Sequence, residues 1–232
     1  MEYSIITTSD KGYFPFLEIL VNSVIEVCDV EFIKNFIIVD TGLEDYQKNN
    51  LTNKFSKITF INTDINTNFE GGIWGDDWRK NVKSKTVTLY ETLLNINHPL
   101  LMLDADIRVV KDLKDLVKLG GDVQVCVRSN HAVKYIGSFF FIINPDKCKE
   151  FVKYWRDLTN SSNEKKAMES PSLVKAVEKF KNKIKIKELS EELVNVVSKD
   201  LLTGNSFIIH FKSKALHKTI EETLEKRIWD NV

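Results

Sequence analysis

The chain of 232 residues carries 33 basic and 33 acidic side chains, so its formal net charge is zero. Because nucleic acids attract proteins through a basic surface, this balance argues against nucleic acid as the main partner. Hydrophobic residues make up 43% of the chain and aromatic residues 10%, which is typical of a globular protein and not of a disordered one. The length is enough for one α/β domain with a large core, and we expect a single domain over residues 1–232.

Cysteine usage and hydropathy favour an intracellular protein. The three cysteines, Cys28, Cys126 and Cys148, are odd in number and far apart, and they lack C-x-x-C spacing. They are therefore predicted to be reduced core residues. No window reaches the roughly 18 consecutive apolar residues of a membrane span, and no basic segment leads into an apolar one at the N-terminus. We expect a soluble, cytoplasmic protein.

The first half of the chain predicts strands that alternate with helices. Short runs of apolar and β-branched residues predict strands at 3–8, 36–39, 58–61 and 101–107. A helix is predicted after Gly12, with Pro15 in its first turn, where proline is tolerated. Its apolar face consists of Leu17, Leu20, Val21, Val24 and Ile25. A second helix is expected over 84–94, after a polar segment at 77–83.

The second half of the chain repeats this alternation. Apolar runs predict strands at 123–127, 138–143, 184–189 and 207–211. Asn144-Pro145 predicts the start of one helix and Ser170-Pro171 that of another, because a capping side chain followed by proline is a helix start signal. A loop is expected at 160–166 and a charged terminal helix at 216–229. The alternation implies a mostly parallel sheet with helices on both faces.

Acidic residues follow several of the predicted strands. In parallel sheets, ligands bind at the carboxyl ends of the strands, and Asp10, Asp40, Asp64 and Asp104 all fall there. The strand at 101–107 is the most informative, because successive strand side chains alternate and Asp104 and Asp106 would share one face. Two carboxylates at a strand end suit Mg²⁺ or Mn²⁺. The alternative is a strand that ends in an ordinary polar turn.

An apolar strand that ends in Asp104-Ala105-Asp106, about a hundred residues into an α/β chain, resembles the metal site of A-type-fold glycosyltransferases. Segment 5–10 resembles the first strand and turn of these enzymes. Segment 208–212 resembles the late His-Phe-X-Gly-X-Lys segment of their family-eight group, which includes glycogenin-like and bacterial galactosyltransferases. The resemblance implies one Rossmann-like domain, with a nucleotide-binding half at 1–106 and an acceptor-side half at 107–232.

The resemblance also implies a role for each matching residue. Asp104, Asp106 and His210 would bind the metal, and Lys85 would reach the donor sugar-diphosphate. Glu169 stands where many relatives carry Asp-Gln, so Glu169 and Lys85 are the expected catalytic residues. The residues expected to bind the donor or the metal are Thr7, Thr8, Asp10, Asp40, Lys85, Asp104, Ala105, Asp106, Gly137, Ser138, His210, Lys212 and Lys214.

The implied reaction is transfer of a sugar from a nucleoside diphosphate sugar, in the first place a UDP-sugar, to an acceptor hydroxyl such as that of a glycan. Mn²⁺ or Mg²⁺ would act as Lewis acid on the diphosphate. Retention of configuration, as in the family-eight group, would need no strong base, whereas inversion would need a carboxylate placed to deprotonate the acceptor hydroxyl. The sequence does not decide between them, and the resemblance leans toward retention. The chain departs from the family pattern at Ser213, which replaces a glycine, and no Pro-Trp follows it.

Each of these residues also has a plainer explanation. Asp10 can simply cap the helix that follows, and Lys85 can be a solvated helix residue. His210 can be a core histidine that bonds a backbone carbonyl, and Glu169 can be an exposed residue just before a helix. The aromatic and charged segment 74–79 suits sugar stacking or a lid, but it can also pack against the body of the protein.

Two other functions remain as alternatives. Haloacid-dehalogenase-type phosphatases also have a strand that ends in Asp-X-Asp, but they carry Thr or Val where this chain has Arg108, and their motif lies near the N-terminus. A Rossmann dehydrogenase is disfavoured because no G-x-G-x-x-G follows a predicted strand. A non-catalytic sugar-nucleotide-binding module would keep the metal site without turnover.

Overall fold

The computed structural model describes residues 1–67, 75–129, 131–162, 169–197 and 201–211. The expected terminal helix at 216–229, together with Lys212, Ser213 and Lys214, lies outside the described residues. The strands are β1 (Tyr3–Ser9), β2 (Ile33–Asp40), β3 (Ile58–Asn62), β4 (Leu100–Leu103), β5 (Ile107–Val109), β6 (Val123–Val127), β7 (Tyr135–Ile142), β8 (Ile186–Ser190) and β9 (Ile208–His210). The helices are α1 (Phe14–Val27), α2 (Asp45–Lys54), α3 (Asp76–Leu94), α4 (Lys114–Val117), α5 (Pro145–Ser161), α6 (Glu169–Phe180) and α7 (Glu191–Val194), with short 3-10 turns at Lys11–Tyr13 and Val30–Phe32.

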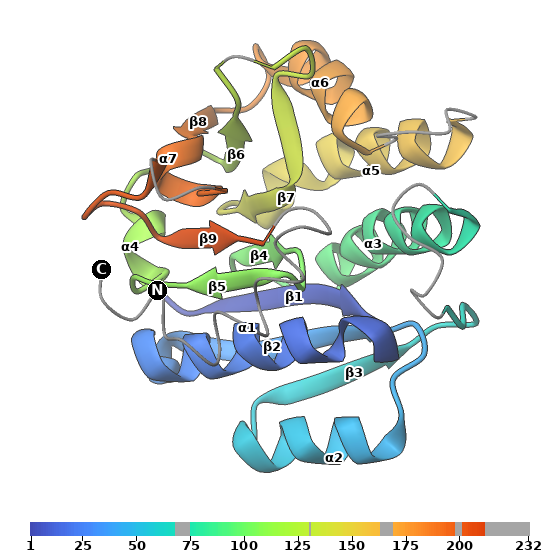
Figure 1. The fold of residues 1–232 in the computed structure, drawn as a ribbon. Coiled ribbons are helices and arrows are strands. Elements are labelled where there is room, and N and C mark those ends of the chain that lie inside the picture. The colour runs from blue at the N-terminus through green and yellow to red at the C-terminus, as the bar shows by residue number, and fades with distance from the viewer. Residues whose placement is uncertain (68–74, 130, 163–168, 198–200, 212–232) are drawn as a thin grey trace.

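The central sheet has seven strands in the order β3-β2-β1-β4-β7-β6-β8. Strand β7 runs antiparallel to both of its neighbours, and every other adjacent pair in this sheet is parallel. Strands β5 and β9 form a small antiparallel sheet beside it (Figure 1). The predicted α/β class with a mostly parallel sheet is confirmed.

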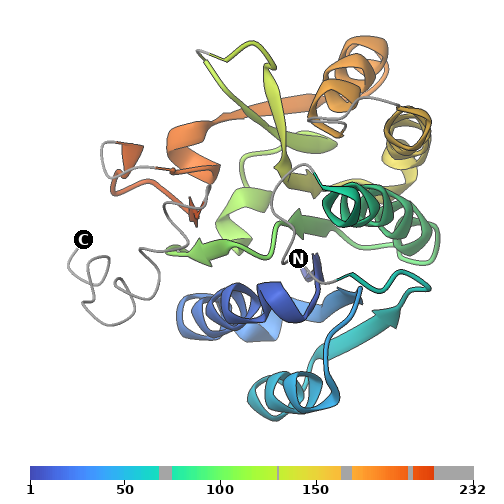
Figure 2. The same ribbon diagram turned by 45° about the vertical axis from the view of Figure 1, so that its right-hand side comes forward.

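Helices cover both faces of the central sheet (Figures 1 and 2). Helices α1 and α2 pack on one face, whereas α3, α5 and α6 pack on the other. Because strand side chains alternate, Ile5 of β1 packs into the first core and Ile6 into the second, and Leu101 and Met102 of β4 divide in the same way. This burial on both faces explains why these strands are continuous apolar runs in the sequence.

Polar side chains cap the 3-10 turn before α1 and the start of α5, and both helices begin close to where the sequence predicts them. Asp10 accepts hydrogen bonds from the backbone N–H groups of Gly12 and Tyr13, which fixes the turn that leads into α1. The side chain of Asn144 accepts from the N–H of Lys147, and Pro145 occupies the first position of α5.

Helix α3 begins at Asp76, well before the expected start at 84, so the polar segment at 77–83 belongs to the helix and the predicted start is wrong. Asp76 and Asp77 lie in its first turn, where negative charge interacts favourably with the helix dipole. Asp76 pairs with Arg79 and Asp77 with Lys80, each three residues apart. The polar segment at 77–83 therefore extends the helix. It was not predicted as helical because it has no apolar stripe.

The predicted strand at 101–107 is interrupted at the two aspartates. Pairing of β4 with β7 ends where Leu103 lies opposite Phe139, and the N–H of Asp104 then donates to the carbonyl of Ser138 at 3.0 Å. The chain bends at 104–106 and continues as β5 in the small sheet. Strand alternation is therefore the wrong explanation for the placement of Asp104 and Asp106, because both lie in a bend.

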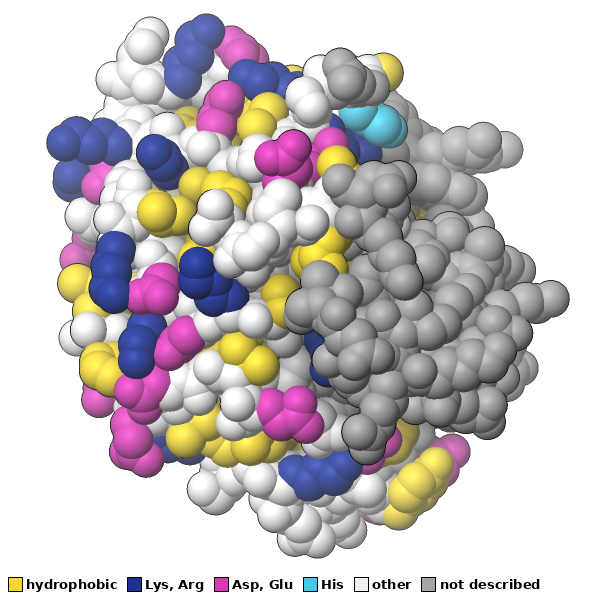
Figure 3. All heavy atoms as spheres, turned by 60° about the vertical axis from the view of Figure 1, so that its left-hand side comes forward, with side chains coloured by type: hydrophobic (Ala, Val, Ile, Leu, Met, Phe, Trp, Pro, Cys, Tyr) yellow, Lys and Arg dark blue, Asp and Glu magenta, His cyan; other side chains and the backbone are white. Residues whose placement is uncertain are grey.

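Smaller differences occur at other boundaries. Helix α5 continues through Asn160 to Ser161, where a loop was expected, and β8 begins at Ile186. The three cysteines are free and buried, as predicted. Among the described helices, none is both long and apolar enough to cross a membrane. On the face drawn in Figure 3, side chains of both charges are interspersed, in keeping with the zero net charge.

Candidate active site

The bend between β4 and β5 brings three potential metal ligands together. Asp104 and Asp106 lie in the bend, and His210 ends β9. The register of the small sheet pairs Ile107 with His210, and the N–H of Phe211 donates to the carbonyl of Asp106 at 2.9 Å. Backbone pairing thus holds His210 next to Asp106, although the two are far apart in the sequence.

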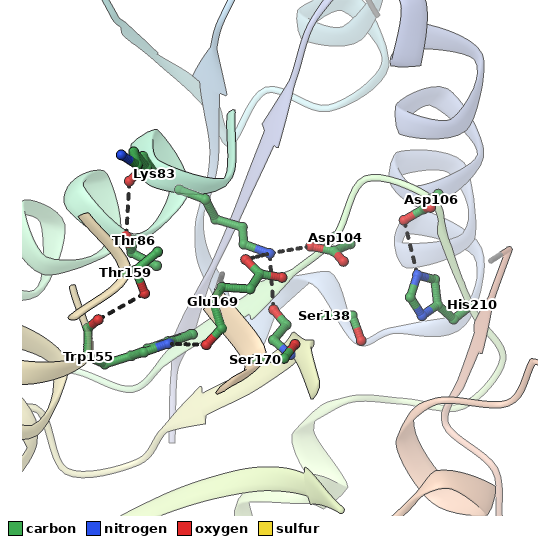
Figure 4. Close-up of polar contacts among 12 residues, drawn as sticks. Lys83, Thr86, Asp104, Asp106, Ser138, Trp155, Thr159, Glu169, Ser170 and His210 are labelled. Carbon is green, nitrogen blue, oxygen red and sulfur yellow. Dashed lines mark hydrogen bonds and ion pairs between the residues drawn. The ribbon is translucent and has the colours of Figure 1, made fainter. Parts of the chain in front are cut away.

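The side chains of this group converge. One ligand atom from each of Asp104, Asp106 and His210 lies within 4.8 Å of the other two. Figure 4 shows the His210 ring turned toward the Asp106 carboxylate, and Nε2 lies 3.3 Å from Oδ1 of Asp106. Two carboxylates and an imidazole are a donor set that suits Mn²⁺ and also accommodates Mg²⁺. Ala105 between the aspartates is buried.

Lys85 extends from α3 into the same region and is almost completely buried. Its Nζ lies 2.7 Å from Oδ1 of Asp104, 2.8 Å from Oε2 of Glu169 and 3.1 Å from the carbonyl of Gly137. Burial lowers the pKa of Lys85, but the carboxylates of Asp104 and Glu169 outweigh it, and the net pKa is above its usual range. The plainer explanation of Lys85 as a solvated residue is wrong.

Glu169 lies in the first turn of α6 and is also buried. It is therefore not the exposed residue ahead of a helix that was the alternative. The backbone carbonyl of Glu169 accepts a hydrogen bond from the indole of Trp155 at 2.9 Å, which anchors the start of α6 on α5 (Figure 4). Its side chain is directed at Lys85, with the backbone of Gly137 alongside.

Gly137 leaves room for the Glu169 side chain to reach Lys85. A Cβ atom at position 137 would lie 2.8 Å from Cδ and from Oε1 of Glu169. The N–H of Gly137 donates to the hydroxyl of Ser170 at 3.2 Å, so the strand and the helix start are in direct contact. Gly137 and Glu169, both expected near the donor sugar, are thus brought together with Lys85.

One residue of this region, Asn195, was not predicted from the sequence. Its Oδ1 lies 2.7 Å from Nδ1 of His210 and 3.2 Å from the hydroxyl of Ser138, and all three side chains are buried. Asn195 follows the four-residue helix α7 and belongs to no motif. Asn195 is recognised as part of the site only because the fold places it beside His210.

The acidic residues expected near the nucleotide base serve local structure. Asp10 caps the turn before α1, and its Oδ2 accepts from the hydroxyl of Thr67 at 3.0 Å. Asp40 accepts from the N–H groups of Gly42 and Leu43 at 2.9 and 2.7 Å. The plainer explanation of Asp10 as a cap therefore describes one of its roles.

Asp40 is held in its charged form. Burial raises its pKa, but the hydrogen bonds from Gly42, Leu43 and Lys48 outweigh this, so the pKa lies below its usual range. Thr7 and Thr8 differ from these aspartates, because their buried hydroxyls have no hydrogen-bond partner among the described residues.

Of the segment 74–79, residue 74 lies outside the described residues, and Asp76–Arg79 form the first turn of α3 instead of a free loop.

This chain matches known proteins in its fold but not in its sequence. No family model matches the chain, and no curated protein matches it in sequence. The galactosyltransferase LgtC, solved with donor and acceptor sugar analogues, superposes with a TM-score of 0.65 at 14% identity over 91% of this chain and 88% of LgtC. The glycosyltransferase GlyE of Streptococcus pneumoniae gives a TM-score of 0.61 at 15% identity over 92% of this chain and 55% of GlyE.

A third neighbour is the bifunctional glycosyltransferase WbbM, with a TM-score of 0.61 at 12% identity over 92% of this chain and 46% of WbbM. This chain has the A-type glycosyltransferase fold. It spans about half the length of GlyE and WbbM and most of LgtC. None of the three neighbours is described as a phosphatase, so the haloacid-dehalogenase alternative gains no support.

Proposed function

We propose that this protein is a metal-dependent glycosyltransferase, which moves a sugar from a nucleoside diphosphate sugar, most simply a UDP-sugar, to a hydroxyl group of a glycan or similar acceptor. The observation that carries the proposal is the convergence of Asp104, Asp106 and His210 at the carboxyl edge of a sheet with the A-type fold. In α/β sheets this edge is where ligands bind.

The metal site suits the reaction because negative charge develops on the leaving diphosphate. Asp104, Asp106 and His210 would hold Mn²⁺ or Mg²⁺, which would supply Lewis-acid stabilisation of that charge. The donor-binding roles that we propose for the remaining described residues follow their place along the same edge: Thr7, Thr8, Asp10 and Asp40 toward the base and ribose, and Ala105, Gly137 and Ser138 near the sugar. Lys212 and Lys214 lie outside the described residues, and we propose that they contact the diphosphate on the family resemblance alone.

Lys85 has a different role from the one that the family resemblance implies. The ammonium group of Lys85 donates hydrogen bonds to Asp104 and to the carbonyl of Gly137, and it forms an ion pair with Glu169. We infer that Lys85 positions the carboxylates of Asp104 and Glu169 and adds fixed positive charge, instead of donating to the diphosphate itself.

Glu169 remains the proposed catalytic carboxylate. It lies 2.8 Å from Lys85 and next to Gly137, and its negative charge would stabilise an oxocarbenium-like sugar bound beside it. Because Lys85 engages this carboxylate, we propose retention of the anomeric configuration, which needs no free base. The anomeric proton coupling of the product, measured by NMR, tests the stereochemistry.

The function is tested by incubating the protein with a panel of UDP-sugars and Mn²⁺ and measuring UDP release, beside phosphate release from a phosphomonoester. We expect UDP release that stops when the metal is chelated and in the Asp106→Asn variant. Phosphate release without UDP release would favour a phosphatase. Metal-dependent binding of UDP without turnover of any donor would favour the non-catalytic binding module.

A further inference from the structure

Besides the side-chain contact of Asn195 with His210, the next residue, Val196, forms backbone hydrogen bonds with β9. The N–H of Val196 donates to the carbonyl of Ile208 at 3.1 Å, and the N–H of His210 donates to the carbonyl of Val196 at 2.8 Å. These bonds fix the backbone around Asn195 against β9. The 2.7 Å contact between the Asn195 amide and the imidazole therefore has a defined geometry.

The orientation of the Asn195 amide follows from its other partner. Its Nδ2 donates to Oε1 of Glu191 at 3.2 Å, and an ionised carboxylate can only accept. The hydroxyl of Ser138 cannot decide the orientation, because a hydroxyl both donates and accepts. Glu191 thus sets the amide, and Oδ1 of Asn195 faces His210.

An amide oxygen accepts hydrogen bonds only, so Nδ1 of His210 must carry the proton. A neutral imidazole has one N–H, which leaves Nε2 with an unprotonated lone pair. Nε2 lies 3.3 Å from Oδ1 of Asp106, so two acceptor atoms face each other at close range. This arrangement is unfavourable unless a proton or a cation lies between them.

We propose that Asn195, oriented by Glu191, is a positioning residue that fixes His210 in the tautomer with the proton on Nδ1, so that Nε2 is presented to a divalent cation together with Asp106. The inference rests on the proposed function, because it takes Asp106 and His210 as metal ligands. It adds that the hydrogen bonds from Glu191 through Asn195 to His210, here called the positioning chain, set the tautomer of His210 before any metal binds. Hydrogen bonds to the second ring nitrogen have the same effect in other histidine metal sites.

The first test is the tautomer in the metal-free protein. Nitrogen NMR of histidine-labelled protein at about pH 8.5, where an ordinary imidazole is neutral, distinguishes a protonated from an unprotonated ring nitrogen. The His210 signals are identified by their loss in His210→Gln. We expect the proton on Nδ1 in the wild type, and a proton on Nε2 would overturn the proposal whatever the behaviour of any other variant.

Variants of the positioning chain make the second test. Asn195→Leu removes the acceptor, and we expect a mixture of tautomers and about 10–100-fold weaker Mn²⁺ binding by electron paramagnetic resonance. Asn195→Asp keeps an acceptor opposite Nδ1 and should retain the wild-type tautomer. Ser138→Ala is the control for the tautomer alone, because it removes the other partner of Oδ1 and leaves the Glu191 bond intact, so Nδ1 should keep the proton.

Glu191→Ala tests the chain without altering Asn195 or His210, and it serves if Asn195→Leu does not fold. The amide is then free to turn, so we expect a mixture of tautomers. A pure Nδ1–H tautomer in both Asn195→Leu and Glu191→Ala would overturn the proposal. The proposed function fails separately: a wild type with the expected tautomer that neither binds Mn²⁺ nor releases UDP would retain the positioning chain and contradict the transferase.

Discussion

Nζ of Lys85 lies between the carboxylates of Asp104 and Glu169, 2.7 Å from one and 2.8 Å from the other, in a buried setting. The three residues come from three separate parts of the fold: helix α3, the bend after β4 and the start of α6. One ammonium group thereby joins the candidate metal ligand to the candidate catalytic carboxylate.

Replacing Lys85 by methionine should destabilise the protein by about 3–5 kcal/mol, because the buried carboxylate of Glu169 and the partly buried carboxylate of Asp104 would lose their common counter-ion. Urea unfolding followed by circular dichroism measures this loss. Lys80→Met is the control, because Lys80 on the same helix pairs with Asp77 at the surface and should have little effect. Equal stability of Lys85→Met and the wild type would show that the buried ion pairs do not operate in solution.

Gly137→Ala should destabilise the protein by about 1–3 kcal/mol and reduce UDP release, because the added methyl group would displace the Glu169 side chain. The double variant with Glu169→Asp shortens that side chain and should recover part of the lost stability in a double-mutant cycle. Gly204→Ala is a matched substitution, since no atom lies within 4 Å of the Cβ position there, and it should be close to neutral. Strictly additive effects of the two substitutions would contradict the contact.

Asp106→Asn should fold normally and bind Mn²⁺ at least about tenfold more weakly, since a neutral amide replaces a charged ligand. Calorimetry with Mn²⁺ and UDP measures the change, and UDP should bind more tightly than ADP or GDP to the wild type. Asp64→Asn removes an exposed carboxylate that follows β3 and lies outside the metal group, so its Mn²⁺ binding should equal that of the wild type. An Asp106→Asn variant with unchanged metal-dependent UDP affinity would remove the metal site.

Asp122 should contribute to stability in a pH-dependent way. Burial raises the pKa of this carboxyl, but hydrogen bonds from the N–H of Lys185 and from Lys147 outweigh it, and the net pKa is lowered. A lowered folded-state pKa means that the contribution is fully present above the unfolded value of about 3.9 and is lost as the pH falls through the folded value. Unfolding measured from pH 3 to pH 7 should therefore show that Asp122→Asn is destabilised at neutral pH and approaches the wild type in acid. A difference that stays constant over this range would contradict the charge-based explanation.

Local signals in the sequence predicted the elements that position the site. Apolar runs identified β1, β2 and β4, Pro15 together with a helical apolar pattern identified α1, and Asn144-Pro145 identified the start of α5. The early start of α3 could not be predicted, because Asp76 and Asp77 stabilise it through charge and not through a periodic apolar face. The bend at 104–106 was also hidden, since it depends on where β7 stops pairing with β4.

The site was predicted as a set of residues but not as a set of contacts. Asp104, Asp106 and His210 were named together, and the structure brings them together. The contact of Lys85 with Gly137 joins segments 52 residues apart, and that of Asn195 with Ser138 joins segments 57 residues apart. Such contacts follow from the packing of helices on the sheet, which no local pattern specifies.

The reversed direction of β7 has a consequence for how the proposed transferase would select its acceptor. Because β7 runs against β4 and β6, the hairpin that joins β6 to β7 opens at the same edge as the bend with Asp104 and Asp106. An insertion in this hairpin would overhang the proposed reaction centre without crossing either core or changing the half proposed to bind the nucleotide. We therefore expect acceptor preference to be exchangeable between proteins of this architecture by grafting this one turn, while the donor preference stays with the recipient.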